Sequence, residues 1–326
     1  MDPYAPLRPI MARCQSTWNE KTFHSAVNVT FHKYESLNYD KAHQDMWQSL
    51  PRQFELLTED LLNSASNSLP DSLSVLDIGC GTGLATTCLL STPLGGRISH
   101  VTLLDSSISM LQLAKARALS WQIPFETFEG LLDQLPAGRE FDLIITSSVL
   151  HHVPDLAAFF EALASKQRPG TFFLHVQDPN GDALNDPILQ SRQASLTTLP
   201  SSSLLNRLHP KRILNRLRRE LSGNQSQNYD ALAVADLVGQ GVTPIPLTIS
   251  ELYQITDIHV NNGEGISIAH LSRQMSDSYR LVNHRTYGFF GVLESDLDGD
   301  RASEERSAIA AGDKNGVFLG AVWQRR

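Results

Sequence analysis

The sequence lacks the features that mark several large classes of protein. It contains only three cysteines in 326 residues, Cys14, Cys80 and Cys88, and their spacing fits neither a zinc site nor a disulfide framework. No apolar run approaches the roughly 20 residues that a membrane-spanning helix needs. The N-terminal segment contains prolines and no apolar core, so it does not resemble a signal peptide. We therefore expect a cytoplasmic protein with no membrane partner.

Positive charge is also scarce. The chain has 27 lysines and arginines against 35 aspartates and glutamates, which gives a net charge of −8. A protein that binds nucleic acid usually needs a basic surface to meet the phosphate backbone, so we expect no nucleic-acid partner. Hydrophobic residues make up 41% of the chain, which is enough for a sizeable core.

Three glycines at alternate positions are the most informative feature of the chain. Residues 75–78 form an apolar run that predicts a short buried strand, residues 84–90 predict a helix, and Gly79, Gly81 and Gly83 lie between them. A strand, a glycine turn and a helix in this order bring backbone N–H groups and a helix N-terminus close to a ligand. Glycine suits such a turn because a Cβ would block the ligand and because the turn favours positive φ.

The turn differs from two common glycine motifs. A dinucleotide fingerprint would have Gly or Ala where this chain has Leu84, and a phosphate-binding loop would have a lysine after the glycines. Asp77 would repel a pyrophosphate, whereas it suits a cationic ligand. The pattern from Asp77 to Gly83 resembles motif I of the class I S-adenosylmethionine-dependent methyltransferases, whose cofactor carries a sulfonium and an ammonium group. Asp77 and Leu84 both disfavour an NAD-dependent oxidoreductase.

Alternating strand and helix patterns from residue 74 onward predict a parallel sheet with helices on both faces. The resemblance implies an α/β fold with a Rossmann-like, seven-stranded, mostly parallel, doubly wound sheet and an antiparallel last strand. We expect a helical N-terminal cap and a helical insert in addition to this core. The expected parts are the cap at 1–69, the cofactor-binding core at 70–180, the helical lid insert at 181–245, and the rest of the core with the final two strands at 246–326.

An acidic residue at the end of the second predicted strand is a candidate for binding the ribose of the cofactor. The carboxylate of Asp105 could accept both hydroxyl protons of a ribose diol, or it could cap the following helix, or do both. The family usually has a further acidic residue for adenine after the glycine that follows the third strand, but Leu131 and Leu132 stand there. The resemblance assigns to the cofactor Asp77, Gly79, Cys80, Gly81, Gly83, Asp105, Ser106, Met110, Gly130, Leu131, Leu132 and Ser147.

Two adjacent histidines follow the fourth predicted strand, where the family resemblance implies residues that face the sulfonium. Neighbouring residues on a helix point about 100° apart, so we expect at most one of His151 and His152 to face the cofactor. A zinc site needs three or four converging ligands, and no spacing in the sequence supplies them, so we expect no metal site. After the fifth predicted strand, His175, Gln177 and Asp178 either contact the substrate or stabilise a turn.

A polar cluster in the N-terminal region is a candidate lid. His32, Glu35 and Tyr39 share one helical face, and Trp47 extends that face if the helix continues. The cluster is either an amphipathic helix with a few capping groups or a lid in which Tyr39 lies near the methionine end of the cofactor. If the reaction requires a base, the candidates are His152, His151, His32 and Glu35, in that order.

The expected activity is methyl transfer from S-adenosylmethionine to a small-molecule or carrier-bound acceptor in secondary metabolism. A basic stretch at 204–221 either meets an acidic ligand or carrier protein or forms a solvated helix face. One alternative is a cyclase that consumes S-adenosylmethionine, such as an azetidine-2-carboxylate synthase, which would release methylthioadenosine. A second alternative is a binding module without catalytic activity.

Overall fold

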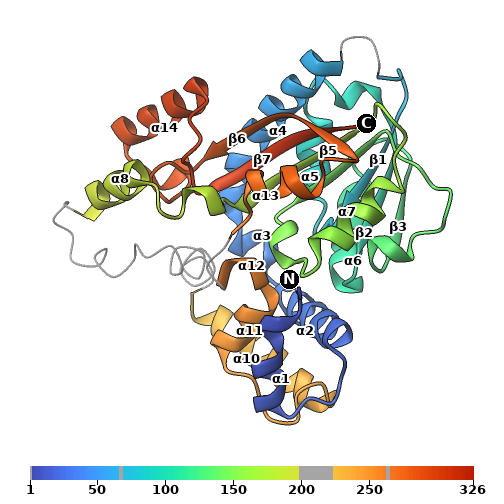
Figure 1. The fold of residues 1–326 in the computed structure, drawn as a ribbon, viewed down its shortest axis with the longest axis vertical. Coiled ribbons are helices and arrows are strands. Elements are labelled where there is room, and N and C mark those ends of the chain that lie inside the picture. The colour runs from blue at the N-terminus through green and yellow to red at the C-terminus, as the bar shows by residue number, and fades with distance from the viewer. Residues whose placement is uncertain (1, 66–68, 198–222, 262–264) are drawn as a thin grey trace.

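The computed structural model describes residues 2–65, 69–197, 223–261 and 265–326. Its centre is a seven-stranded sheet with the strand order β3-β2-β1-β4-β5-β7-β6 (Figure 1). β1 to β5 pair in parallel, and β7 runs antiparallel to both β5 and β6. The predicted α/β sheet with an antiparallel last strand is therefore confirmed. The strands are β1 (Leu73–Ile78), β2 (Ile98–Asp105), β3 (Phe125–Glu129), β4 (Leu143–Ser147), β5 (Phe172–Pro179), β6 (Tyr279–Tyr287) and β7 (Phe318–Arg325).

The central strands are buried on both faces of the sheet. In β1, Val75 belongs to the apolar cluster on one face and Leu76 to the cluster on the other, and Phe172 and Phe173 of β5 divide in the same way. This double burial explains why these strands are continuous apolar runs rather than alternating patterns. Parallel neighbours need long crossover connections, and helices supply these here.

Helices cover each face of the sheet. The first face is covered by α4 (Gln44–Ala65), α5 (Leu84–Leu90) and α6 (Ile108–Ala118), and the second by α7 (Leu156–Ala164) and α13 (Ile268–Gln274). Near the β6 end of the sheet, α8 (Pro187–Thr197) and α14 (Gly299–Ala311) pack around Phe289 and Phe290. None of the described helices combines the length and the apolar composition that crossing a membrane requires.

A separate group of helices forms a cap beside the sheet. It consists of α1 (Arg8–Cys14), α2 (Glu20–Glu35), α10 (Gly223–Gly239) and α11 (Ile249–Thr256), which gather below the sheet in Figure 1. They share an apolar cluster that includes Phe23, Val27, Leu237 and Leu252. The short helices α3 (Tyr39–Ala42) and α12 (Ile258–Asn261) lie between the cap and the sheet.

The packing groups the elements differently from the four expected parts. Helix α4 lies inside the expected cap, but its residues Leu50, Phe54 and Leu57 pack on the sheet. Helix α11 lies inside the expected last part of the core, but it packs in the cap together with α10 of the expected insert. The basic stretch at 204–221 falls outside the described residues.

The contact of α4 with the sheet gives a stability prediction. Phe54 is fully buried in the cluster that α4 shares with the sheet. Replacing a buried phenylalanine by alanine removes its transfer free energy and leaves a cavity, so Phe54→Ala should lower the free energy of unfolding by about 3–5 kcal/mol. Urea denaturation measures this change. The exposed Glu59→Ala on the same helix should change it by less than about 0.5 kcal/mol, and equal effects of the two substitutions would contradict the packing.

Candidate active site

A cavity of about 540 Å³ lies between the carboxyl ends of the central strands and the cap. Such a volume lies within the range of about 300–1,000 Å³ that is typical of small-molecule sites. The sheet contributes Gly79 and Gly81 after β1 and Asp105 at the end of β2, while α2 contributes residues that include His24 and Glu35. The cavity therefore lies at the edge of the sheet where open α/β folds bind their ligands.

The glycine turn, residues 79–83, has the backbone conformation that the sequence predicts. Gly79, Gly81 and Gly83 have φ values of 62°, 52° and 82°, all in the left-handed region. A Cβ on Gly79 would come within 2.6 Å of the Val149 side chain, whereas a Cβ on Gly81 would meet no protein atom within 4 Å. Because Gly81 lines the cavity, the space beside it is a cradle that any side chain would fill.

The carboxylate of Asp105 joins the glycine turn to the end of β2. Oδ2 accepts a hydrogen bond from the Gly81 N–H at 2.9 Å, and Oδ1 accepts one from the Ser107 N–H at 2.8 Å. Burial raises the pKa of Asp105. The N-cap of α6 is Ser107, so the alternative expectation that Asp105 caps this helix is wrong. Asp105 lines the cavity and remains suitable for a ribose diol.

Most of the residues that the sequence assigned to the cofactor lie together on the cavity wall. Leu131 and Leu132 lie there next to Asp133, which also lines the cavity. Cys80 and Gly83 do not line the cavity: the Cys80 N–H donates to the Leu104 carbonyl at 3.0 Å, and Gly83 precedes α5. The assigned residues on the wall are Gly79, Gly81, Asp105, Ser106, Met110, Gly130, Leu131, Leu132 and Ser147.

The cap contributes a histidine held by a carboxylate. Nδ1 of His32 lies 2.8 Å from Oε2 of Glu35, and Nε2 of His43 lies 3.4 Å from Oε1 of the same carboxylate. The Tyr39 ring packs against the His43 ring with centroids 4.5 Å apart. All four residues line the cavity, which places the predicted polar cluster at the site rather than on the protein surface.

Both histidines after β4 line the cavity, where the sequence predicted that at most one would face the cofactor. They lie on a short 3₁₀ turn, η4 (Leu150–His152), and their ring centroids are 4.0 Å apart. Nδ1 of His151 lies 3.0 Å from Oδ1 of Asp178, and the His152 Nδ1–H donates to the Thr256 carbonyl at 2.6 Å.

Asp178 is fully buried behind these histidines. Burial would raise its pKa, but hydrogen bonds from His151 and His175 outweigh burial, so the pKa of Asp178 is lowered. The pairing of β5 with β7 shifts register between His175 and Asp178, and Nδ1 of His175 lies 3.3 Å from Oδ2 of Asp178. Such a register shift re-aims side chains next to a site.

Two residues other than glycine have positive φ at the same edge of the sheet. Ser148 has a φ of 59° and Gln177 a φ of 66°, and both line the cavity. The buried Tyr287 hydroxyl donates to Oε1 of Gln177, and the Ser148 N–H donates to the Val176 carbonyl at 2.9 Å. Residues held in this conformation cost of order 1 kcal/mol or more and concentrate at functional sites.

Comparisons with known proteins identify the domain that carries this site. Residues 75–170 match the methyltransferase domain family. The ubiquinone biosynthesis O-methyltransferase of Methylobacterium sp. (strain 4-46) is 34% identical over 102 residues, which is 31% of this chain and 39% of that enzyme. The enzyme of the same name from Xylella fastidiosa (strain 9a5c) is 37% identical over 100 residues, 29% of this chain and 38% of that one. Residues 75–170 therefore form a methyltransferase domain, and they are similar to class I S-adenosylmethionine-dependent methyltransferases.

The match to these curated relatives spans less than half of their length. Among solved structures, the magnesium protoporphyrin IX methyltransferase of Synechocystis PCC 6803 with bound S-adenosylhomocysteine is similar with a TM-score of 0.43 and 13% identity. That comparison covers 88% of this chain and 86% of that one.

The residues of this methyltransferase domain fit S-adenosylmethionine, the cofactor of its superfamily. The cradle at Gly81 admits a ligand against bare backbone, and Asp105 offers a carboxylate beside it. Met110 and Leu132 offer apolar surface for a base. The fit rests on these wall residues.

Asp77 lies beneath the glycine turn rather than on the wall of the cavity. Its side chain is fully buried, and Oδ2 accepts a hydrogen bond from the Thr86 hydroxyl at 2.6 Å. Burial raises the pKa of Asp77 to about 7. The sequence argument treated Asp77 as a charged carboxylate that meets the cofactor cation directly, whereas the structure shows a buried carboxyl of raised pKa that is hydrogen-bonded to Thr86 of α5.

The segment that follows the cap helix α2 is joined to the glycine turn through Arg117 of α6. The Arg117 guanidinium donates to the Thr82 hydroxyl at 2.7 Å and also to the Asp40 carboxylate, while the Thr82 hydroxyl donates to Asp40 at 2.7 Å. The Trp47 ring packs on the Arg117 guanidinium at 4.6 Å. Trp47 therefore packs on Arg117 and does not line the cavity, although it extends the predicted face of the polar cluster.

The Gly81 cradle gives a binding prediction. An alanine at this position would take up a left-handed conformation at a cost of about 1–2 kcal/mol and would place a methyl group in the cradle. Gly81→Ala should therefore weaken binding of S-adenosylhomocysteine by at least about tenfold, as measured by calorimetry. Gly96→Ala is the control, since its Cβ also meets no atom within 4 Å and its φ is not in the left-handed region. Unchanged affinity in Gly81→Ala would place the cofactor elsewhere.

The raised pKa of Asp77 gives a prediction for the pH dependence of stability. The unfolded chain releases this proton near the ordinary value of 3.8, whereas the folded protein holds it until about 7. The contribution of Asp77 to the free energy of unfolding therefore falls as the pH rises from about 4 to 7 and is constant above that. Asp77→Asn removes this contribution, so the variant should gain stability relative to the native protein between pH 4 and pH 8.

Urea denaturation across this pH range measures the difference. Asp71→Asn is the matched control, because the Asp71 side chain is fully exposed. A difference between Asp77→Asn and the native protein that stays constant with pH would contradict the raised pKa.

Proposed function

We propose that the protein transfers the methyl group of S-adenosylmethionine to a hydroxyl oxygen of a small molecule. The observation that carries this proposal is the imidazole of His32, held by the Glu35 carboxylate on the cavity wall. A hydroxyl acceptor must lose a proton during transfer, and a positioned imidazole accepts it. When bound, S-adenosylmethionine supplies an electrophilic methyl group on a positively charged sulfur.

The charge of the cavity supports a neutral acceptor. Among the described residues that line it, Lys21 is the only lysine or arginine, and its ammonium pairs with Asp133 at 3.0 Å. A site that recognises a carboxylate or phosphate usually contains an arginine, whose guanidinium can donate two parallel hydrogen bonds. The described residues that line the cavity include no arginine. The wall offers imidazole, amide and carboxylate groups instead, and these suit hydrogen bonds to a hydroxyl.

His32 has the arrangement of a general base. Glu35 accepts the Nδ1–H of His32, so Nε2 is the nitrogen that can accept a proton. The ring of His32 lies edge-on to that of His152, with centroids 5.4 Å apart, which places it at the meeting point of the cap and the core. This arrangement moves His32 ahead of His152 and His151 in the order of candidate bases. Residues of α2 line the cavity opposite the strand ends.

The names of the curated relatives support oxygen as the atom modified. Those relatives are named O-methyltransferases of ubiquinone biosynthesis, so their names favour a hydroxyl group as the acceptor. The names do not support secondary metabolism as the context of the reaction. A carrier-bound acceptor is a finer expectation that depends on the basic stretch at 204–221, and we propose a free small molecule in its place.

Product analysis tests the proposed reaction directly. Incubation with S-adenosylmethionine and a panel of phenols and catechols should yield S-adenosylhomocysteine and a methyl ether, detected by mass spectrometry. Methylthioadenosine formed from S-adenosylmethionine alone would support the cyclase alternative. Transfer only to amines or thiols would contradict an oxygen acceptor.

The carboxylate of Glu35, which accepts a hydrogen bond from His32, should affect kcat rather than the affinity for the cofactor. Glu35→Gln and His32→Gln should each lower kcat by about 100-fold, because general base catalysis contributes about 10²–10⁴-fold. Affinity for S-adenosylhomocysteine should change little. Steady-state kinetics and calorimetry measure the two quantities.

Glu20→Gln on the same helix is the control for this pair, because Glu20 is exposed in the first turn of α2 and pairs with Arg8 outside the cavity. Full activity of His32→Gln with a hydroxyl acceptor would show that another group accepts the proton.

A further inference from the structure

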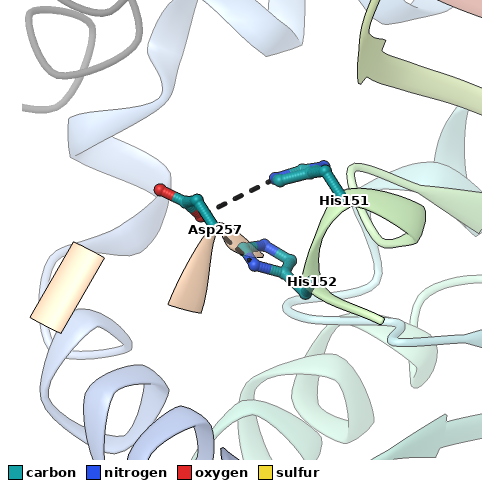
Figure 2. Close-up of side chains that lie close together, drawn as sticks. All are labelled: His151, His152 and Asp257. Atoms are coloured by element: carbon teal, nitrogen blue, oxygen red, sulfur yellow. Dashed lines mark ion pairs between the residues drawn. The ribbon is translucent and has the colours of Figure 1, made fainter. Parts of the chain in front are cut away.

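Two histidines and an aspartate from distant parts of the chain converge at the cavity. His151 and His152 come from η4, and Asp257 follows the last residue of α11 (Figure 2). One potential ligand atom from each residue lies within 4.8 Å of the others. Asp257 is buried, so its carboxylate meets the imidazoles away from bulk water. Figure 2 shows the side chains of His151, His152 and Asp257 close together.

The spacing of these atoms matches that of ligands around one metal ion. Oδ1 of Asp257 lies 3.2 Å from Nδ1 of His152 and 3.9 Å from Nε2 of His151. Two donor atoms that are each about 2.1 Å from a zinc ion lie roughly 3.4 Å apart at the tetrahedral angle. The two observed distances bracket this value, so small side-chain rotations would place all three atoms around a common centre.

His151 makes a hydrogen bond to Asp178 of the kind that histidine ligands of a metal usually make through their second ring nitrogen. A histidine that binds a metal typically donates its other ring N–H to a carboxylate or a backbone carbonyl, which fixes the ring orientation. Nδ1 of His151 lies 3.0 Å from the buried carboxylate of Asp178, which leaves Nε2 as the ligand atom. Asp178 is in turn held by His175. Asp178 also accepts the backbone N–H of His151 at 3.3 Å, so it holds both the ring and the 3₁₀ turn.

We propose that His151, His152 and Asp257 bind a divalent transition-metal ion, with zinc as the leading candidate. Imidazole nitrogens and one carboxylate favour such an ion over magnesium or calcium, which prefer sets of oxygen ligands. Three protein ligands leave a coordination position open, as catalytic zinc sites do. Because both histidines line the cavity, the open position faces the space for the acceptor.

Binding requires one change in the hydrogen bonds of the cluster. The His152 Nδ1–H donates to the Thr256 carbonyl at 2.6 Å, and this nitrogen must lose its proton before it can bind an ion. The proton goes to solvent. The neutral imidazole and the carboxylate then share the ion rather than the proton.

The role of the ion, unlike its binding, rests on the proposed function. An acceptor hydroxyl coordinated at the open position would have a lowered pKa, because a bound cation stabilises the oxyanion. Its proton would pass to Nε2 of His32, whose ring contacts His152. The cation would thus prepare the oxygen that receives the methyl group, and His32 would take the proton that leaves.

Metal titration tests the site without any methyl transfer. Zinc added to chelator-treated protein should bind with a one-to-one stoichiometry in calorimetry, and cobalt(II) should give the visible absorption of a nitrogen-ligated ion. His151→Gln and Asp257→Asn should abolish both signals. Asp178→Asn, which loosens His151 without removing a ligand, should weaken zinc binding by about 10–100-fold.

His43→Gln is the matched control, since this histidine lines the same cavity but lies outside the cluster. It should bind zinc as the native protein does, and binding of S-adenosylhomocysteine by every variant shows that the fold is retained. Absence of saturable zinc binding to the native protein would overturn the proposal, as would equal binding by His151→Gln and Asp257→Asn.

The titration also separates this inference from the proposed function. Protein that methylates a hydroxyl but binds no zinc would overturn the metal site alone. Protein that binds zinc through these residues but never forms S-adenosylhomocysteine would overturn the methyl transfer and leave the site in place. Methyl transfer at the same rate with and without zinc would show that the ion does not act on the acceptor.

Discussion

The hydrogen bond between the Gly81 N–H and the Asp105 carboxylate is the constraint on which the site depends. It joins the turn after β1 to the end of β2, and it is possible only because Gly81 has a φ of 52°. A side chain at this position would fill the space beside that carboxylate. The same carboxylate also receives the Ser107 N–H, so the start of α6 is fixed relative to the turn. One buried acidic group thereby sets the floor of the cofactor cavity.

Helix α3, which follows α2 of the cap, makes a second contact with the same turn. Arg117 belongs to α6, whose start Asp105 positions, and its guanidinium meets both Thr82 of the turn and Asp40 of α3. The α3 segment carries Tyr39, and α2 before it carries His32 and Glu35. The contacts of Arg117 with Thr82 and Asp40 thus help to position the segment next to the proposed base, His32. A change at the turn would move the proposed base as well as the cofactor.

The sequence predicted local features of this architecture well and long-range ones poorly. Positive φ at Gly81 is local, because it depends on neighbouring residues. The contribution of Asp257 to the site was missed, since it lies more than a hundred positions after His152 in a segment whose helix, α11, packs in the cap. No periodicity or spacing signals such a contact, which tertiary packing alone creates.

Asp77 and His151 show two other limits of the sequence argument. Asp77 was assigned a charge from its identity, but full burial raises its pKa to about 7, and burial depends on the packing of α5 over β1. His151 and His152 were expected to diverge from their adjacent positions on a helix, whereas their ring centroids lie 4.0 Å apart. In both cases the residue types were informative and the environment decided their properties.

The His–Asp cluster takes its residues from both the cap and the core. Asp257 is anchored by α11, a cap helix, while His151 and His152 are anchored at the end of a core strand. Bringing these groups together is costly unless they share a proton or a cation, because buried ionisable groups lose their hydration. The cluster therefore depends on the contact between the cap and the core, because each supplies part of it.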